Sequence, residues 1–511
     1  MKKIMALVLA AMLLLGCCSF AAAEDVPEGY PAIIEGLNFD GAEVYIYDWY
    51  STGTRSENPT EEEQLTYDYR DWLEATYNCK IIETALSDWT NQPAELQNFV
   101  MNQNPDNKLA IIGIGGGFAG PAVNNDLYMA WTYGLDSGLY DPMTVEFMTK
   151  NGVCRGVPGG SNVEPRQCVM FNKKVLENAG IKWEELYDLQ KNMEWTWDKF
   201  EAYMDIINEG ADTNGDGEAD VWALTGNGDD VTVALVVSNE ADFFKVDEAT
   251  GKLVPAIKDQ EFLDALQRRQ EWQTKYMRPN EQWDDYQRFW PEGNVAFIIG
   301  QSYEGFNADS LVSQIGDWGC VAMPMGPNAK RYTSAADNNV FGIPNVYDEA
   351  TSLKLQQIYT LYRMPTPGTE EEVEEGEEDL SWATQYYGRG CDDRAIEETY
   401  AMLRKVENAT IMNYNKIGDR NSSITEVTWH IGDGTPAEIA EAAWGPFQQR
   451  CDVYNGDKTQ EEVDAENAAA QAAKEAEEAA AEEAPAEEAP AEEAPAEEAP
   501  AEEAPAEEPA A

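Results

Sequence analysis

The chain has 511 residues, with 95 acidic and 35 basic side chains and a formal net charge of −60 at pH 7. This length suffices for two or three domains. The charge argues against a nucleic-acid partner, because a phosphate backbone needs lysine and arginine to neutralise it. Residues 461–511 hold 19 acidic residues and one lysine, so the rest of the chain still carries −42.

The N-terminus has the pattern of an export signal, which we place at residues 1–23. Lys2 and Lys3 precede an apolar run over 4–15 that is too short to span a bilayer. Two cleavage sites compete. The sequence Leu-Leu-Gly-Cys ending at Cys17 resembles a lipobox, which would make Cys17 a lipid anchor, whereas Ala21–Ala23 fits ordinary signal peptidase. Both place the mature chain outside the cytoplasmic membrane.

Six cysteines follow the signal, and their spacing matches no zinc pattern. An exported chain is permitted disulfides. Cys154 and Cys168 flank a Gly/Pro-rich turn and could pair, but six cysteines allow 15 connectivities.

The first part of the chain alternates strand and helix patterns. Alternating apolar residues predict a strand over 42–49, and apolar residues at helical spacing predict a helix over 61–77. Further strands are predicted over 80–85 and 108–114, and the second is apolar throughout, as in a buried parallel strand. This order favours βαβ units in an α/β lobe.

Three glycines, Gly115–Gly117, follow the apolar strand. Their spacing does not match a dinucleotide-binding loop. A phosphate loop remains the alternative to a tight turn whose backbone approaches a neighbour or a ligand.

The later elements are mostly helical. Helices are predicted over 183–210, 259–276, 350–363 and 395–406, with Thr196 as an N-cap inside the first; short strands are predicted over 295–299 and 318–322, and a solvated acidic loop over 370–379. From about 457 the sequence consists mostly of Ala, Glu and Pro, and AEEAP occurs five times from Ala481 to Pro505. Such a segment cannot bury a core, so 457–511 is expected to be a disordered acidic tail.

One loop has the spacing of a calcium ligand set. It places oxygen-bearing side chains at alternate positions around Gly217, and the expected ligands are Asp212, Asn214, Asp216, the backbone carbonyl of Glu218, and Asp220. The twelfth position is Ala223, not the bidentate Glu of a complete loop. The loop is therefore expected to hold a structural Ca²⁺ ion, and the alternative is an empty Asx-rich turn.

Five motifs in order resemble the family 1 extracellular solute-binding proteins of bacterial ABC importers, the carbohydrate type. The motifs are Gly156-Val157-Pro158 followed by 169–174 (VMFNKK), 195–200 (WTWDKF), the loop 212–220, 289–297 (FWPEGNVAF) and 319–327 (GCVAMPMGP). The resemblance covers about residues 40–450. The acidic loop and the AEEAP tail lie outside the family pattern.

The resemblance implies a two-lobed periplasmic-binding (Venus flytrap) α/β fold with hinge strands. It places a bilobal domain over 24–456, with lobe one at about 40–158 and 340–390 and lobe two at about 165–335 and 392–455. Crossings between the lobes are expected near 157–168, 328–340 and 385–395. A solute would bind between the lobes and be buried when they close.

The same resemblance nominates the ligand-binding residues by their places after strands and beside the hinge. They are Trp49, Tyr50, Gly116 within the turn 115–118, Gln301, Tyr303, Asp337 and Asn338, with Asn339 beside them. Trp222, Trp283 and Trp444 are weaker candidates for stacking on a sugar.

The implied function is capture of a carbohydrate or related solute and its delivery to the permease subunits of an ABC importer, without catalysis. The alternatives are a secreted carbohydrate-active enzyme, a receptor-coupled solute sensor, and a surface scaffold that binds a partner through the half-loop. The single histidine, His430, has no serine or cysteine signature beside it. A dockerin-like scaffold needs two copies of the half-loop, and this chain has one.

Overall fold

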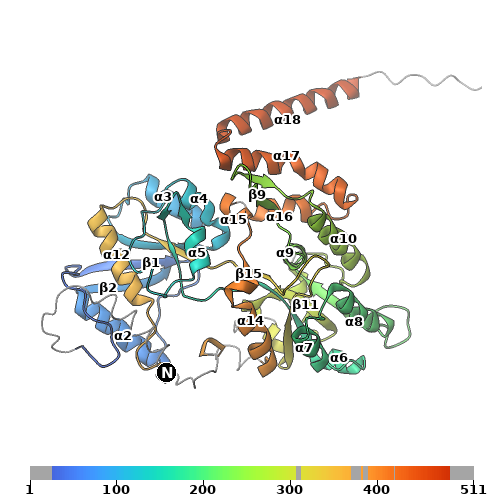
Figure 1. The fold of residues 1–511 in the computed structure, drawn as a ribbon, viewed down its shortest axis with the longest axis horizontal. Helices are drawn as coiled ribbons and strands as arrows, with labels where there is room; N and C mark the ends of the chain where they lie inside the picture. The colour runs from blue at the N-terminus through green and yellow to red at the C-terminus, as the bar shows by residue number, and fades with distance from the viewer. Residues whose placement is uncertain are drawn as a thin grey trace, which may run out of the picture. The chain divides into compact units, whose positions relative to one another are not determined.

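A computed structural model of the chain describes residues 26–282, 284–305, 312–369, 381–383, 390–418 and 420–483. The chain divides into two compact units, one ending at Asn455 and one beginning at Gly456. The first unit contains two α/β halves, each with its own sheet and its own hydrophobic core (Figure 1). We call them lobe one and lobe two, and the predicted two-lobed α/β fold is confirmed.

The sheet of lobe one has the strand order β2-β1-β3-β14-β6. Strands β1 (Ala42–Asp48), β2 (Cys79–Ala85) and β3 (Leu109–Ile114) are parallel. Strands β14 (Val340–Gly342) and β6 (Val157–Pro158) extend the sheet in antiparallel fashion. Five of the six residues of β3 are buried, which agrees with its continuous apolar sequence.

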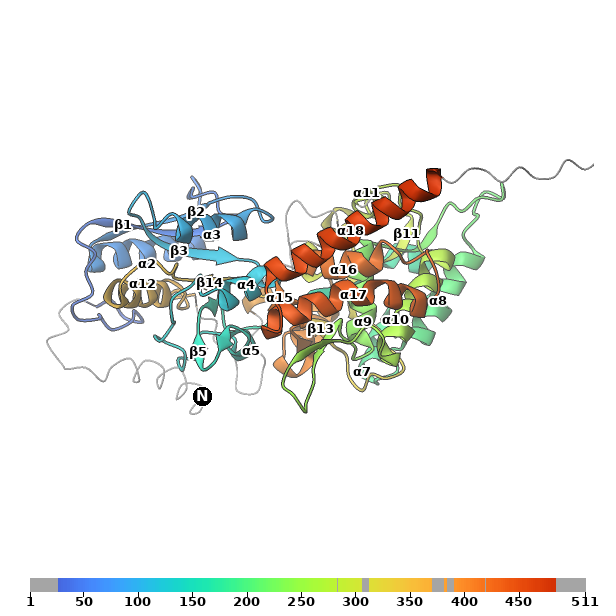
Figure 2. The same ribbon diagram turned by 90° about the horizontal axis from the view of Figure 1, so that it is seen from above.

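Helices cover both faces of this sheet. Helices α2 (Glu61–Tyr77) and α12 (Glu349–Tyr362) lie side by side on one face, and α3 (Gln92–Met101) lies on the other (Figures 1 and 2). Helix α2 begins where predicted because Thr60 and Glu63 form a reciprocal capping box. The shorter elements of the lobe are the 3₁₀ turn η1 (Gly116–Phe118), α4 (Ala119–Asn124), α5 (Pro142–Phe147), β4 (Thr149–Lys150) and β5 (Val153–Cys154).

The sheet of lobe two has the order β12-β7-β11-β8. Strands β8 (Trp222–Gly226) and β11 (Val295–Gln301) are parallel. Strand β7 (Gln167–Asn172) runs antiparallel to β11 and to β12 (Trp318–Ala322). The carboxyl ends of β8 and β11 therefore meet at one edge of the sheet.

The helices that contact this sheet include α6 (Lys173–Asn178), α7 (Glu184–Lys191), α8 (Trp197–Glu209) and α9 (Gly228–Ser238), and α10 (Gln260–Lys275) packs on α9. The other elements are β9 (Phe244–Val246), β10 (Leu253–Pro255), α11 (Asp285–Phe289), η2 (Ser302–Gly305), η3 (Val312–Ile315), β13 (Ser334–Ala335), η4 (Ser381–Ala383), η5 (Ala395–Tyr400), α14 (Ala401–Leu403), η6 (Val406–Asn408), β15 (Ala409–Thr410), α15 (Tyr414–Ile417), α16 (Arg420–Thr428) and α17 (Pro436–Asn455).

Two helix predictions need correction. The helix expected over 183–210 is two helices, α7 and α8, because Met193 adopts a positive φ of 60° and the fully buried Trp195 side chain donates to the carbonyl of Ala322. Thr196 does cap α8 through its side chain, as predicted. The helix expected over 395–406 begins as a π-helix and becomes α-helical at α14, which ends at Leu403.

The chain crosses between the lobes in the segments 159–166 and 323–339, close to two of the predicted crossings. A small cluster of Val163, Ala336 and Ala409 packs where these segments meet the chain at β15, which pairs with β13. The third predicted crossing, 385–395, falls partly outside the described residues, and Ala383, which precedes it, already belongs to the core of lobe two. The acidic loop 370–379 lies outside the described residues.

The suggested Cys154–Cys168 disulfide is absent. Cys154 belongs to the core of lobe one and Cys168 to that of lobe two, and all six described cysteines are free thiols.

The C-terminal unit also departs from expectation. Residues 457–511 were expected to be disordered throughout, but Gln460–Glu483 form helix α18. This stretch has no proline and is rich in alanine, the best helix former, and Thr459 and Glu462 cap its start. Residues 484–511, which carry nearly all of the AEEAP repeats, lie outside the described residues, as do residues 1–23 with Cys17.

Candidate functional site

The predicted ligand residues lie after the carboxyl ends of β1, β3 and β11 and in the crossing that leads to β14. Ligands commonly bind outside this edge of an open α/β sheet. In lobe one, the buried carboxylate of Asp48 accepts hydrogen bonds from the backbone amides of Tyr50 and Ser51 and from the Ser51 hydroxyl. This turn presents Trp49 and Tyr50, whose rings meet edge to face with centroids 5.3 Å apart. Tyr50 is 55% exposed.

A further exposed aromatic side chain of lobe one, Trp89, was not predicted from the sequence. Asp88 accepts backbone hydrogen bonds from Thr90 and Asn91 and so fixes the turn that carries Trp89. The Trp89 indole lies on the backbone of Gly115, where a β-carbon would stand 2.9 Å from its Nε1 atom. The ring is 37% exposed. The turn after β3 is therefore rich in glycine because side chains there would collide with its neighbours. This agrees with the tight turn predicted from the sequence rather than with a phosphate loop.

Lobe two contributes a carboxylate at the start of a helix. Asp230 stands in the first turn of α9, where a negative charge is favoured by the helix dipole. Its oxygens accept from Gln301 Nε2 at 3.1 and 3.2 Å and from Gln167 Nε2 at 3.3 Å. The guanidinium of Arg420 lies 3.5 Å from the same carboxylate. Gln301 was predicted; the other three residues were missed.

The crossing segments contribute a second ion pair. Arg166 Nη2 donates to the backbone carbonyl of Asp337 and lies 3.9 Å from its carboxylate. Asp337 in turn contacts Gly116, and the Arg420 side chain packs on Gly117. The turn of lobe one therefore touches residues of both ion pairs. We call Arg166, Asp230, Gln301, Asp337 and Arg420 the polar cluster.

Tyr303 and Glu304 flank the polar cluster. Burial and the charges of Glu304 and Asp230 raise the pKa of Tyr303 to about 12. Burial, followed by the charge of Asp230, raises the pKa of Glu304 to about 7. Tyr303 nevertheless keeps 37% of its surface exposed, so its ring is available to a ligand.

Three buried polar atoms around the cluster have no hydrogen-bonding partner among the described residues. They are Arg166 Nε, Gln167 Oε1 and Asp337 Oδ1. A buried donor or acceptor left unpaired costs about 1–3 kcal/mol. The atoms have almost no exposed surface, so a ligand could pair with them only after the groups that cover them move; at Asp337 Oδ1 one such group is Gly116 of the lobe-one turn.

The structure thus brings together four of the predicted residues, Gly116, Gln301, Tyr303 and Asp337. Asn338 is buried beside them, but its amide nitrogen donates to Asp141, Thr144 and the Asn162 carbonyl, and its oxygen accepts from the amide of Glu164. These bonds hold the crossing. Trp49 and Tyr50 stand at the end of β1, where Asn339 and Arg363 both lower the burial-raised pKa of Tyr50, which is about 12.

The weaker stacking candidates lie elsewhere. Trp222 and Trp444 pack against the core of lobe two, and Lys258 covers the Trp444 ring at 4.1 Å. Trp283 lies outside the described residues. His430 is on the surface, paired with Asp433 at 2.6 Å.

The calcium-type loop is formed but closed on itself. Gly217 has a φ of 92°, as the predicted sharp turn requires. Asp212 accepts from the amides of Gly215, Asp216 and Gly217, and Asp220 accepts from Thr213 and Asn214. Hydrogen bonds lower the pKa of both carboxyls.

Within the described part of the chain, no group of three or more His, Cys, Asp or Glu side chains is placed to hold a metal ion. The loop in this conformation does not gather the expected ligands. Calcium binding there stays a prediction from the sequence.

Comparisons with known proteins support the fold. The chain is similar to the solved structure of the GacH receptor of Streptomyces glaucescens, determined unliganded and with acarbose (TM-score 0.54, 12% identity, 80% of this chain and 98% of that one). It is also similar to the cyclic α-maltosyl-1,6-maltose binding protein of Arthrobacter globiformis (TM-score 0.55, 15% identity, 80% and 98%). A third is an ABC substrate-binding protein of Listeria monocytogenes in complex with cycloalternan (TM-score 0.54, 12% identity, 80% and 99%).

The chain thus has the two-lobed fold of maltose-binding-protein-like substrate-binding proteins. No family model matches the sequence, and no curated protein matches it. At sequence identities of 12–15%, the structural similarity establishes the fold alone.

Proposed function

We propose that the protein is the solute-binding component of an ABC importer and captures an uncharged carbohydrate at the polar cluster. The solved structures that share its fold include sugar-binding proteins, such as those with acarbose and with cycloalternan. The proposal rests mainly on the three unpaired buried atoms beside Asp230 and Asp337. Sugar hydroxyls both donate and accept, so one ring could pair with all three.

The charges of the cluster favour a neutral ligand. Each guanidinium already has a carboxylate, Arg420 with Asp230 and Arg166 with Asp337. Burial, with Asp230 beside it, raises the pKa of Asp229, so a negative charge is already disfavoured there. A phosphate or uronate would meet no surplus positive charge.

Aromatic rings supply the complementary apolar surface. Trp89 and Tyr50 of lobe one and Tyr303 of lobe two are partly exposed, and Gly115–Gly117 connect the first ring to the cluster. A pyranose has one apolar face, which stacks on such rings, and a rim of hydroxyls that pairs with amides and carboxylates.

A thermal-shift screen tests this proposal. Neutral mono- and oligosaccharides would be compared with sugar phosphates and uronates. A ligand at 100 times its Kd stabilises the native state by about 2.7 kcal/mol, which raises the melting temperature by about 3 °C in a domain of this size. We expect this shift for a neutral saccharide. A shift confined to the anionic sugars, or release of a cleaved product, would contradict the proposal and favour a different solute or an enzyme.

Export and delivery to permease subunits belong to the same proposal. The described residues include no helix long and apolar enough to cross a membrane. Cys17 would anchor the chain to the outer face of the cytoplasmic membrane, and mass spectrometry of the mature N-terminus would show whether Cys17 carries lipid. Uptake lost on deletion of the gene would support transport, whereas uptake unchanged with a lost transcriptional response would support a sensor.

A further inference from the structure

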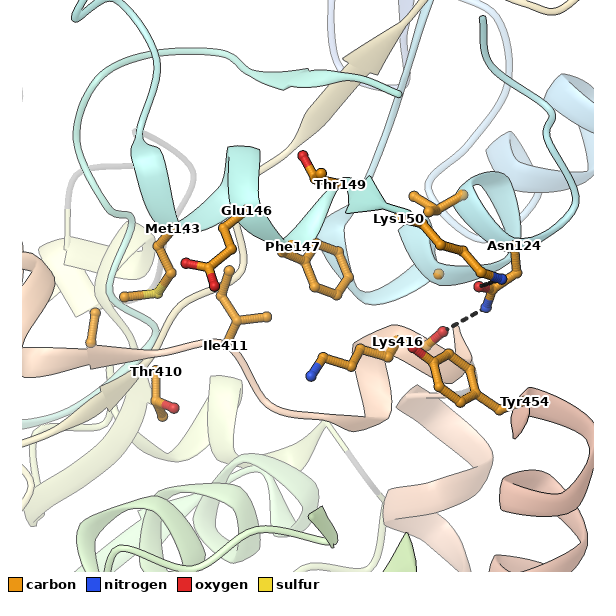
Figure 3. Close-up of a pocket in the computed structure, with 13 residues that line it drawn as sticks. Asn124, Met143, Glu146, Phe147, Thr149, Lys150, Thr410, Ile411, Lys416 and Tyr454 are labelled. Carbon is orange, nitrogen blue, oxygen red and sulfur yellow. Dashed lines mark hydrogen bonds between the residues drawn. The ribbon is translucent and has the colours of Figure 1, made fainter. Parts of the chain in front are cut away.

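A pocket of about 540 Å³ is lined by none of the residues of the polar cluster. Figure 3 shows the side chains that line it. One wall comes from α4, α5 and β4 of lobe one. The other comes from β15, from Ile411, and from Lys416 and Tyr454 of lobe two. Gly120, at the start of α4, packs against the backbone carbonyls of Asn415 and Lys416, and this contact borders the pocket. The volume is in the range of small-molecule sites.

Two opposite charges face this pocket without partners. Figure 3 shows the Lys416 ammonium and the Glu146 carboxylate reaching into the same space from the two walls. Neither group has a hydrogen bond or ion pair with any described residue. The other cation, Lys150, is already engaged, because it donates to Asn124 Oδ1 at 2.8 Å.

Apolar side chains line the pocket around the two charges. Met143 and Phe147 of α5 face Ile411, and Tyr454 closes one side (Figure 3). An ammonium, a carboxylate and an apolar surface in one pocket complement a molecule that carries a carboxylate, an ammonium and an apolar side chain.

We propose that this pocket binds a small zwitterion, a free amino acid or a dipeptide with an apolar side chain. Its carboxylate pairs with Lys416, its ammonium with Glu146, and its side chain lies against Phe147 and Ile411. The site shares no residue with the polar cluster, and its test does not require carbohydrate binding.

The position of the pocket ties this ligand to the arrangement of the two lobes. Its walls belong to both lobes, so the ligand binds differently to arrangements in which the lobes stand closer or further apart. A ligand with such a preference shifts the equilibrium between them, and the coupling is reciprocal. This coupling rests on the proposed function: where the arrangement of the lobes also sets the affinity for carbohydrate, the amino acid and the carbohydrate change each other's affinity by the same factor.

Calorimetric titration with L-leucine tests the site. Two analogues each lack one charge: leucinamide has no carboxylate and 4-methylpentanoate has no ammonium. We expect saturable binding of L-leucine, with each analogue at least about tenfold weaker. These probes need no variant, so misfolding cannot affect the result.

Variants then locate the site. Lys416→Met and Glu146→Gln should each weaken L-leucine binding at least about tenfold, and Lys199→Met, on the exposed surface of α8, should leave it unchanged. The melting temperature of each variant confirms that it folds. The proposal is overturned if L-leucine, L-phenylalanine and glycyl-leucine give no saturable heat at about 10 mM. It is equally overturned if both pocket variants bind as the unmodified chain does.

Discussion

The polar cluster and the calcium-type loop contain the same kinds of side chain, carboxylates and amides, but use them differently. In the loop, each hydrogen bond to a carboxylate comes from a residue at most seven positions away, and the segment is exposed. In the cluster, Asp230 binds Gln167, Gln301 and Arg420, which come from three distant parts of the chain.

This difference distinguishes polar groups that only order a loop from polar groups that are available to a ligand. A loop that satisfies its own hydrogen bonds needs no ligand to be stable. A cluster assembled from the two crossings, α9, β11 and α16 is held by the whole fold. Arg166 Nε and Asp337 Oδ1 of the cluster, and Oε1 of the neighbouring Gln167, still have no hydrogen-bonding partner among the described residues. Buried polar groups that have no hydrogen-bonding partner after folding are the groups whose pairing with a ligand gains the most free energy.

The largest effect is expected from Asp230→Ala. It removes a charged acceptor shared by two amides and a guanidinium, and hydrogen bonds to charged groups are worth about 1.5–3 kcal/mol each. Affinity for the saccharide found in the screen should fall at least about 100-fold by calorimetry. Asp230→Asn keeps the shape and shows how much of the loss is due to charge. Unchanged affinity in both folded variants would remove the cluster from the binding site.

The next effect is on stability. Glu304 has a pKa of about 7 in the folded chain, above the ordinary 4.5, because of its burial and the charge of Asp230. The folded state therefore retains the Glu304 proton more tightly than the unfolded state, and stability falls as the pH rises from 4.5 through about 7.

Between about pH 5.5 and pH 8 this loss amounts to about 2 kcal/mol. Glu304→Gln mimics the protonated acid, so it should melt at a higher temperature than the unmodified chain at pH 8 and show a flatter pH profile. Equal profiles for the two proteins would show that Glu304 titrates normally.

A smaller effect is expected from loss of the exposed aromatic rings of Tyr303 and Trp89. Tyr303→Ala and Trp89→Ala each remove a stacking surface but leave the hydrogen-bonding groups, so affinity should fall about tenfold. Tyr303→Phe keeps the ring and should bind nearly as well as the unmodified chain. Trp444→Ala, whose ring is covered by Lys258, is the matched control for loss of a tryptophan. A larger loss in the control than at Trp89 would place the ligand elsewhere.

The smallest effect is expected at the calcium-type loop. The Asp212 and Asp220 carboxylates also accept hydrogen bonds within the loop, so removal of the predicted Ca²⁺ ion by EDTA should lower the melting temperature by only about 1–2 °C. Asp212→Asn should not alter saccharide affinity. A melting temperature that EDTA leaves unchanged would contradict the predicted ion site.

Sequence patterns predicted the local elements well where the signals were themselves local. The capping box at Thr60 and the apolar spacing of 61–77 gave the bounds of α2, and the apolar run at 109–114 indicated a buried parallel strand. The break between α7 and α8 was missed because it depends on the tertiary burial of Trp195. Helix α18 was missed because the disorder expected of the proline-containing AEEAP repeats was assigned to all of 457–511.

The site was predicted only in part. Gln301 and Tyr303 follow a recognisable strand, and Asp337 lies beside a crossing. Asp230 is one of 95 acidic residues, and Arg420 lies 190 positions further along the chain, so no pattern of spacing joins them. The glycines at 115–117 gave a usable signal: such a turn marks a close backbone approach, here to Trp89, Asp337 and Arg420.

A crystal structure of the chain with the saccharide from the thermal screen tests the central claim most directly. The account predicts sugar hydroxyls on the Asp230 carboxylate, on Gln167 Oε1 and on Asp337 Oδ1, with a sugar ring on Tyr303 and the turn Gly115–Gly117 shifted to admit it. A saccharide bound elsewhere, with the polar cluster unchanged and its three atoms still unpaired, would contradict the account.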